Sequence, residues 1–509
     1  RTLLADILFA RAVDAFSAKD YAQSLAYLEE SQAHGKSGRD VAMMRAWLHY
    51  QAGEDRQAAD AFIDLYRAQQ DRDIAEGIVF SLSRSGRWDE LAGLADSLGG
   101  PLKEEAGPPF SQRFYFRKLF VASDAAAPGE FAELDNFAAP NITLGVMLRD
   151  KAGNEGTSAL RVLKAPALEG AVAISGTHEV RLQLDRVTLD SGSLPAGAAV
   201  GTFPVAGAYV VAPTTRLANS VEPFLSYQHQ GTLTTYAGIG MTPSGAAVSS
   251  APVGNLGVTR QTENGNWSAE LFSQPVRESI LSYTGMVDPY GGPNWGRVRR
   301  TGALVRGYTA LSENWGVSGR LRAMSLKGQN VANNRGKGIS LSLARNLTLP
   351  GFDYVAVGPD ITFETYDKNL SGFTIGNGGY FSPKRLLSLG FTANLQTAEA
   401  RRYSIKGNFS LGYFDKSEAE STCFPLGGLP FNPACPNAAA SHASGLYYSG
   451  QLLGVWRYTN ELQLGGGLIY GRNPQYNDKS AAIFMRYSFY PRPAVMSSDI
   501  PDAMFQRLY

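Results

Sequence analysis

Ala481-Ala-Ile-Phe-Met-Arg-Tyr-Ser-Phe-Tyr490 is the segment that decides the expected fold. Successive side chains of a β-strand point to opposite faces, so every second residue shares a face. The two faces of this segment differ in polarity: Ile483, Met485, Tyr487 and Phe489 lie opposite Phe484, Arg486 and Ser488. An apolar face opposite a charge-bearing face is typical of a strand between lipid and water. A soluble sheet also alternates, so the prediction depends on whether the pattern recurs.

The same alternation recurs upstream, through residues 141–490. The apolar positions of five further segments are Val180, Leu182 and Leu184; Val317, Leu321 and Ala323; Ile339, Leu341 and Leu343; Tyr403, Ile405, Phe409 and Leu411; and Leu462, Leu464, Leu468 and Tyr470. Serine, asparagine, lysine or arginine alternates with them. A soluble sandwich would bury the apolar face, whereas a transmembrane barrel turns it to lipid and the polar face to a lumen.

Segment length and connection length favour the barrel. The segments run for about 9 to 13 residues, as a tilted spanning strand requires. Tight turns such as 263–266 and 311–313 alternate with long loops, which are expected at 190–220, 286–296, 366–384 and 414–446. Such asymmetry is expected when one rim meets the periplasm and the other the exterior. The sequence therefore predicts an antiparallel outer-membrane β-barrel of about 16 strands over residues 141–490, with an aqueous lumen.

Composition limits the functional classes. The chain has 509 residues, with 47 Lys+Arg against 46 Asp+Glu, and a net charge of +1 gives no reason to expect nucleic acid as a partner. The longest uncharged stretch, 191–215, contains three prolines and would make a poor spanning helix. The chain begins inside a helical pattern, so we expect further residues to precede it in the native protein.

Residues 1–98 show helical spacing and an internal repeat. Tyr21, Asp55 and Trp88 occupy equivalent positions 34 and 33 residues apart, and Gly53 and Gly86 supply the turn before the second and third. This is the period of tetratricopeptide repeats, which stack into a solenoid with a concave face. We expect a periplasmic scaffold that docks to another protein or to the cell wall. The alternative is a spacer that only sets a distance.

Two further segments and one cysteine pair complete the organisation. Residues 99–140 are expected to be a linker, in which the aromatic and basic stretch 110–121 forms a helix at the barrel mouth or packs on the last repeat. The tail 491–509 follows two prolines; it is expected either to fold back and occlude part of the lumen or to be a disordered end. Cys423 and Cys435, in a Gly/Pro-rich loop, predict a disulfide in an oxidising compartment, with two free thiols as the alternative.

The chain shows no strong catalytic signature. Its five histidines are scattered without metal-ligand spacing, and no phosphate-binding loop or dinucleotide fingerprint occurs. His229 lies beside hydroxyl residues on an expected strand, a weak resemblance to barrel lipases. We therefore predict a protein that is not an enzyme and that uses no cofactor and no metal.

Several stretches resemble the C-terminal barrel domain of the bacterial cellulose synthase family of outer-membrane cellulose exporters, in which tetratricopeptide repeats precede the barrel. They are Gly145–Arg149, Gly156–Ser158, Arg186–Gly192, Ser273–Val276, Ser279–Tyr283, Asp288–Pro289, Trp295–Gly302 and Gly378–Pro383. The resemblance implies a periplasmic repeat scaffold that feeds a polysaccharide pore of 16 strands. The family usually carries many more repeats than this chain shows.

The expected function is an outer-membrane export pore for an exopolysaccharide, cellulose first among the candidates. The substrate path is expected to include Trp295, Tyr380, Phe381, Arg320, Arg322 and Asn408. Aromatic faces stack on sugar rings, and lumen arginine and amide groups exchange hydrogen bonds with a sliding neutral chain. For each aromatic residue the alternative is loop packing or an interfacial girdle.

The expected partners are a glucan chain, outer-membrane lipid and, through the repeats, an inner-membrane synthase complex or peptidoglycan. Two other functions stay open from the sequence. One is a general porin-like channel with a periplasmic tether, and the other is a barrel enzyme.

Overall fold

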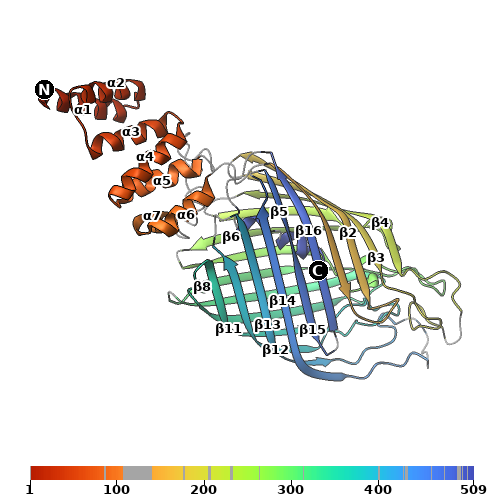
Figure 1. Cartoon of the computed structure of the whole chain (residues 1–509). Helices are drawn as coiled ribbons and strands as arrows, with labels where there is room; N and C mark the ends of the chain where they lie inside the picture. Colours follow the sequence, from red (N-terminus) through yellow and green to blue (C-terminus); the bar gives the residue numbers. More distant parts are fainter. Residues whose placement is uncertain are drawn as a thin grey trace.

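The computed structural model contains a helical region and a large β-barrel (Figure 1). The structure describes residues 2–106 and 140–509, apart from 85–86, 176–177, 205–207, 230–232, 263, 313, 399–401, 428, 430–433, 460, 475, 490–494, 496 and 501. The expected behaviour of stretch 110–121 therefore lies outside the described residues. None of the described helices is both long and apolar enough to span a membrane.

Seven helices make up the N-terminal region: α1 (Thr2–Ser17), α2 (Tyr21–Ala33), α3 (Arg39–Gln51), α4 (Asp55–Ala68), α5 (Arg72–Arg84), α6 (Trp88–Leu98) and α7 (Gly100–Ala106). The three aligned repeat positions, Tyr21, Asp55 and Trp88, each begin the second helix of a pair. The Asp20 side chain caps α2 by accepting a hydrogen bond from the Gln23 amide. Phe62 and Tyr66 of α4 are fully buried in the core between helices, because one helical pair alone cannot cover its apolar face.

Sixteen antiparallel strands form the barrel: β1 (Asn141–Lys151), β2 (Leu160–Ser175), β3 (His178–Asp190), β4 (Arg216–His229), β5 (Leu233–Met241), β6 (Pro252–Thr262), β7 (Gly265–Pro275), β8 (Gly296–Ala310), β9 (Trp315–Gln329), β10 (Asn334–Asn346), β11 (Phe352–Tyr366), β12 (Arg385–Thr397), β13 (Tyr403–Glu418), β14 (Ser441–Arg457), β15 (Leu462–Asn473) and β16 (Tyr476–Ser488). Each strand pairs with its neighbours in sequence, and β1 pairs with β16 to close the barrel. The prediction of about sixteen strands is confirmed.

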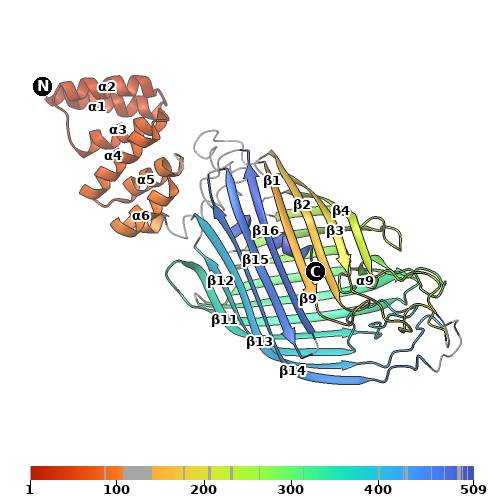
Figure 2. The same cartoon turned by 45° about the vertical axis from the view of Figure 1, so that its right-hand side comes forward.

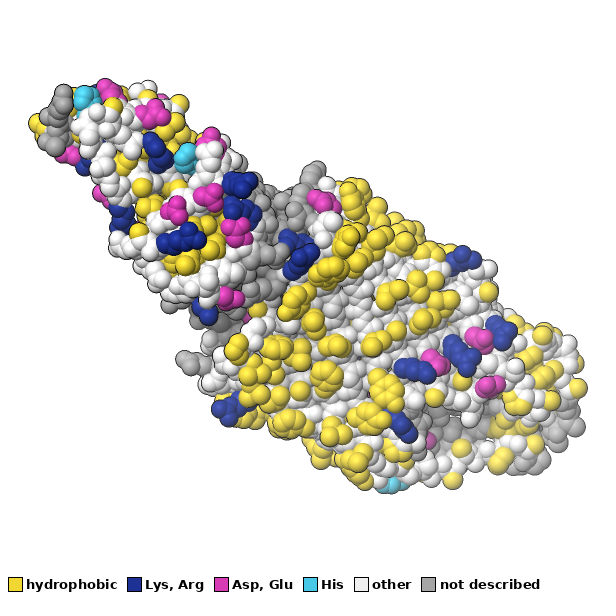
Figure 3. Space-filling model, in the orientation of Figure 1, with side chains coloured by type: hydrophobic (Ala, Val, Ile, Leu, Met, Phe, Trp, Pro, Cys, Tyr) yellow, Lys and Arg dark blue, Asp and Glu magenta, His cyan; other side chains and the backbone are white. Residues whose placement is uncertain are grey.

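The last strand carries the polarity that the sequence predicts. Ile483 is 71% exposed on the outer face, whereas Phe484 is 5% exposed on the inner face. Residues Arg486 and Ser488 are also buried. Exposed apolar side chains of this kind form a broad band around the barrel (Figure 3). Because a closed barrel has no second sheet to cover this band, the soluble-sandwich alternative is excluded and the band faces lipid.

The two rims of the barrel differ in loop length. The strands are joined at one rim, the turn rim, by short connections such as 347–351 and 458–461. The opposite loop rim carries 191–215, 276–295, 367–384 and 419–440. Figure 2 shows these loops gathered at one end of the strands. The loop expected at 414–446 is shorter than predicted, because β13 and β14 extend beyond the membrane band as a paired ribbon.

Candidate functional site

The lumen wall of β9 to β13 is lined by small polar side chains. They alternate with the exposed apolar residues of the same strands and include Ser318, Ser340, Ser342, Thr362, Asn394, Asn408 and Ser410. We call this set the hydroxyl–amide wall. Neighbouring members bond to one another across strands: Ser318 Oγ and Ser342 Oγ lie 2.9 Å apart, and Thr362 Oγ1 donates to Ser340 Oγ at 3.0 Å. Their remaining donors and acceptors give a passing polar molecule many similar, weak partners.

The predicted polar path residues lie on this inner surface. Asn408 Nδ2 donates to Asn394 Oδ1 at 2.5 Å, between β13 and β12. Arg320 and Arg322 of β9 face the lumen, and Arg322 Nη2 donates to Glu364 Oε1 at 2.6 Å. Register pairs Arg306 with Arg320, which places basic side chains together on β8 and β9. Their part in a substrate path stays a prediction.

The three predicted aromatic residues are placed differently from one another. Trp295 is fully buried and Tyr380 is 2% exposed. Tyr380 Oη accepts a hydrogen bond from Asn334 Nδ2 at 3.2 Å, and burial raises the pKa of this tyrosine. Both rings pack the interior of the loops, so neither offers a free face to a sugar in this state. Phe381 is 39% exposed, and its ring lies 5.4 Å from Lys416 Nζ.

An inward loop occupies part of the lumen. It spans 276–295 and contains the short helix α9 (Ile280–Thr284), whose residues are all buried. Ser279 begins α9 with a capping box to Ser282, which satisfies the amides at the helix start. Ile280 and Leu281 pack against lumen-facing residues of the barrel in one apolar cluster. Sequence reasoning expected this loop to lie near the rim and missed its burial.

A buried ion network anchors this loop to the barrel wall. Glu222 of β4 accepts from Arg277 Nη2 at 2.7 Å, from Tyr283 Oη at 2.7 Å and from Lys164 Nζ at 2.6 Å. Lys164 Nζ also donates to Asp185 at 2.9 Å. Burial and the nearby Glu222 carboxylate raise the pKa of Tyr283 to about 12, so its hydroxyl stays a donor at neutral pH.

The C-terminal tail also lies inside the barrel. Among its described residues, Val495, Ile500, Met504, Phe505 and Leu508 are buried. They pack with lumen-facing residues of β1 and β16, and α10 (Asp502–Gln506) forms its last turn. Charged contacts fix both ends: Lys406 Nζ donates to Asp502 at 2.5 Å, and Arg507 Nη1 donates to Asp185 at 2.8 Å. The hypothesis of a tail that folds back into the lumen agrees with these contacts.

One arginine joins the tail to the inward loop. Arg149 of β1 is buried, and its Nη1 donates to the Arg277 carbonyl oxygen and to the Leu508 carbonyl oxygen, each at 2.7 Å. Its Nη2 donates to Asp478 of β16 at 2.6 Å. The guanidinium also lies 4.3 Å from the centre of the Tyr509 ring. Sequence reasoning missed this role, although Arg149 ends one of the stretches that carry the family resemblance.

The remaining candidates from the sequence lie away from this centre. The His229 ring stacks on His178 with centroids 4.4 Å apart, and its Nδ1 has no hydrogen-bond partner among the described residues. The described part of the chain contains no group of histidine, cysteine and acidic residues arranged to hold a metal ion. Within that part of the chain, nothing around His229 supplies the oriented base that a hydrolase needs.

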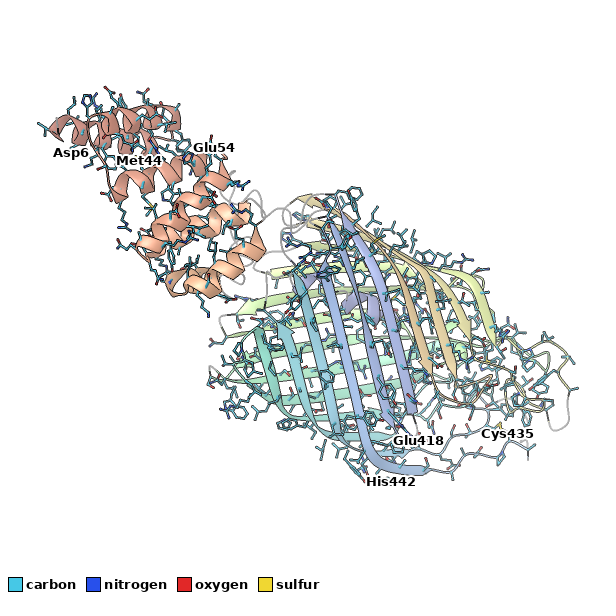
Figure 4. The ribbon with its side chains drawn as sticks, viewed as in Figure 1. Asp6, Met44, Glu54, Glu418, Cys435 and His442 are labelled. Atoms are coloured by element: carbon cyan, nitrogen blue, oxygen red, sulfur yellow. A yellow bond between two sulfur atoms is a disulfide. The ribbon has the colours of Figure 1, made fainter. Side chains whose placement is uncertain are left out.

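Cys423 and Cys435 form a disulfide in the loop 419–440, beyond the loop-rim ends of β13 and β14 that carry Glu418 and His442 (Figure 4). The Cys423 carbonyl oxygen accepts hydrogen bonds from Thr374 and Asn377, so this loop is tied to the loop 367–384.

Replacing both cysteines by serine is expected to speed cleavage of loop 419–440 by a protease added to intact cells. Opening a loop of this length removes about 3 kcal/mol of constraint on the unlinked loop. The measurement is the half-life of the full-length band, compared with a Ser421→Ala variant that keeps the disulfide. Equal half-lives would contradict a role of the disulfide in holding this loop.

The comparisons agree with the closed barrel. The family profile described as "Cellulose synthase operon protein C C-terminus" matches residues 158–490. The chain is 31% identical over 271 residues to cellulose synthase operon protein C of Xanthomonas axonopodis pv. citri, covering 48% of this chain and 18% of that protein. It is 26% identical over 358 residues to the protein of the same name from Pseudomonas fluorescens, covering 68% and 27%. The chain thus spans about a quarter or less of the length of these relatives.

Among solved structures, a bacterial polysaccharide outer membrane secretin covers 69% of this chain and 99% of its own, with a TM-score of 0.43 and 10% identity. OprB of Pseudomonas putida covers 71% and 96%, with a TM-score of 0.30 and 11% identity. These scores are too low to carry a functional argument. The family match spans the strands from β2 to β16 of this outer-membrane barrel, and the chain therefore belongs to the family of cellulose synthase operon protein C C-terminal domains.

Proposed function

We propose that this barrel is the outer-membrane export pore for an exopolysaccharide, and that the polymer is cellulose. The observation that carries the proposal is the hydroxyl–amide wall, whose serine, threonine and asparagine side chains line β9 to β13. A neutral glucan presents hydroxyl groups along its whole length, and these groups exchange hydrogen bonds with such a wall at nearly constant energy. Conduction requires many weak sites of this kind, because one strong site would hold the chain. The family membership and the names of the relatives agree with this substrate class.

The inward loop and the tail form the gate of this proposed pore. Both occupy the lumen beside β1 to β4, and Arg149 bonds to both. The hydroxyl–amide wall lies on other strands, so the polymer is expected to pass between this wall and the loop–tail assembly. Trp295, Tyr380 and Phe381 would meet sugar rings only if the loops 276–295 and 367–384 move. Arg320, Arg322 and Asn408 contribute from the wall itself.

The helical region is proposed to be a set of tetratricopeptide repeats in the periplasm. The support is the coincidence of the three aligned positions with three helix starts. The proposed organisation is a repeat scaffold over 1–98, a linker over 99–140, the barrel over 141–490 and a lumen tail over 491–509. The scaffold would dock to an inner-membrane synthase complex or to peptidoglycan and deliver the chain to the barrel.

The proposed pore performs no catalysis and needs no cofactor. Its family consists of outer-membrane export barrels, which are generally not enzymes, and the driving force would come from polymer synthesis at the inner membrane. Substitution of His229 should therefore leave secretion unchanged.

Removing three hydroxyl groups from the wall is expected to lower polymer secretion about fivefold. The variant is Ser340→Ala/Ser342→Ala/Thr362→Val, which changes volume little. Each lost hydrogen-bonding group is worth about 1 kcal/mol to a passing hydroxyl, so the energy along the path becomes uneven. The measurement is secreted glucan from a deletion strain that expresses the full chain.

The control for this experiment is Leu341→Ala, which lies between the two serines on the lipid-facing side of β10. It is expected to secrete normally. Equal secretion by the wall variant and the wild type would contradict the role of the wall. Continued secretion in the deletion strain without any copy of the protein would overturn the proposed function and leave a general porin-like channel as the better description.

A further inference from the structure

A depression of about 560 Å³ lies on the outer surface of the barrel, across the closure between β1 and β16. Its floor and walls come from β1, β2, β3, β15 and β16, and its lining is mostly apolar. The exposed side chains Leu148, Leu163 and Leu468 belong to it. We call it the closure depression. Because these residues lie on the lipid-facing side of the strands, the occupant of the depression is a component of the membrane.

The depression spans the height at which the apolar band ends. Along β1 the outward residue after Leu148 is Asp150; along β2 the one before Leu163 is Arg161; and along β16 the one before Ala481 is Lys479. Outward neighbours on a strand are about 7 Å apart, so apolar and charged groups meet within one headgroup depth. The charged end of each strand points to the loop rim. In an outer-membrane barrel long loops face the exterior, so this is the outer leaflet.

Basic side chains outnumber acidic ones at this edge. Arg161, Lys479, Arg216 and Arg472 lie at the loop-rim ends of β2, β16, β4 and β15, against Asp150 and Asp190. Figure 3 shows basic and acidic side chains alternating in a row across the ends of these strands, next to the apolar band.

The ion pairs at this edge leave the basic groups available. Arg161 Nε lies 3.7 Å from Asp150 Oδ1, and Lys479 Nζ lies 3.2 Å from Asp150 Oδ2. The Arg161 and Lys479 side chains are 70% and 60% exposed. Exposed pairs of this kind stabilise a protein little, so exchanging the shared carboxylate for a phosphate costs little. Arginine also binds phosphate through two parallel hydrogen bonds, which a membrane acyl chain alone cannot offer.

We propose that the closure depression binds a phosphorylated, multi-acyl saccharolipid of the outer leaflet. Its acyl chains lie on Leu148, Leu163 and Leu468, and its phosphate bonds to Arg161 and Lys479. The bound lipid covers the seam between the first and last strands, the one pairing in the barrel that joins residues more than 300 positions apart. The site is separate from the lumen and does not depend on which polymer passes through it.

The test uses the full chain purified in detergent and titrated with lipid A as the probe, with phosphatidylethanolamine as the comparison lipid. Binding is followed by native mass spectrometry. The Arg161→Gln/Lys479→Gln variant is expected to bind lipid A at least about tenfold more weakly than the wild type, from the loss of two charge-assisted contacts. Leu163→Trp, which fills the depression and keeps both charges, is expected to weaken binding as well.

Lys337→Gln is the matched control, because Lys337 is an exposed, outward basic residue near the loop-rim end of β10, on another face of the barrel. It should bind lipid A as the wild type does. Heat-modifiability on gels checks that each variant forms a barrel. The proposal is overturned if the wild type shows no preference for lipid A over phosphatidylethanolamine. It is also overturned if the control and the double variant lose affinity equally, or if both the double variant and Leu163→Trp retain full affinity.

Discussion

Deleting residues 491–509 is expected to raise the single-channel conductance of the barrel at least about twofold. The tail lies inside the lumen, where Ile500, Phe505 and Leu508 are buried against β1 and β16. Ions cannot pass through the volume that these side chains fill, and water replaces them once they are removed. The conductance of single channels in planar bilayers measures the effect directly.

The deletion also removes apolar partners from the barrel wall, so a milder variant belongs beside it. Lys406→Met breaks the 2.5 Å contact with Asp502 and keeps the whole tail. It is expected to give brief openings to the deletion level, because one end of the tail is released. An unchanged conductance in the deleted protein would show that the tail leaves the lumen once the barrel is in a bilayer.

The second large effect is expected from Arg149→Met, which takes the guanidinium away from the buried Asp478 carboxylate. Breaking a buried ion pair from one side costs about 3 to 5 kcal/mol of stability. The same change removes the hydrogen bonds to the Arg277 and Leu508 carbonyl oxygens, so the inward loop and the tail are no longer joined. We expect a lower urea midpoint in lipid vesicles together with a noisier, higher conductance.

A double variant separates the two consequences. Arg149→Met/Asp478→Leu removes both charges, and a buried pair replaced by apolar residues is often neutral for stability. The urea midpoint is therefore expected to return towards that of the wild type, while the conductance stays high. If the conductance instead returned with the stability, Arg149 would act only through the barrel wall and would not join the loop to the tail.

Sequence reasoning reached the barrel because strand polarity is a local property. In the final strand, Ile483 and Met485 face outward and Phe484 and Arg486 face inward, as the two-residue period requires. The number of strands followed from counting such segments, and the placement of Arg320, Arg322 and Asn408 on the inner face followed from the same parity. The three repeat positions likewise predicted helix starts at Tyr21, Asp55 and Trp88.

The burial of Trp295 and Tyr380 could not be predicted in this way. Both lie in glycine-rich loops, where the backbone has no period that fixes the direction of a side chain. Their environment is set by contacts between the loops 276–295 and 367–384, such as the hydrogen bond from Ser279 Oγ to the Gly379 carbonyl oxygen at 2.7 Å. Such contacts join residues a hundred positions apart and leave no local signal.

The sequence by itself determined which residues meet lipid and which meet the lumen, because neighbouring side chains on a strand must point to opposite faces. Only the tertiary structure decided what fills the lumen. The closing of β1 on β16 brings Arg149 beside Asp478, and the returning chain then places Leu508 and Arg277 within reach of the same guanidinium. A buried charge has to be paired, and its partners here come from four segments that only the closed barrel brings together.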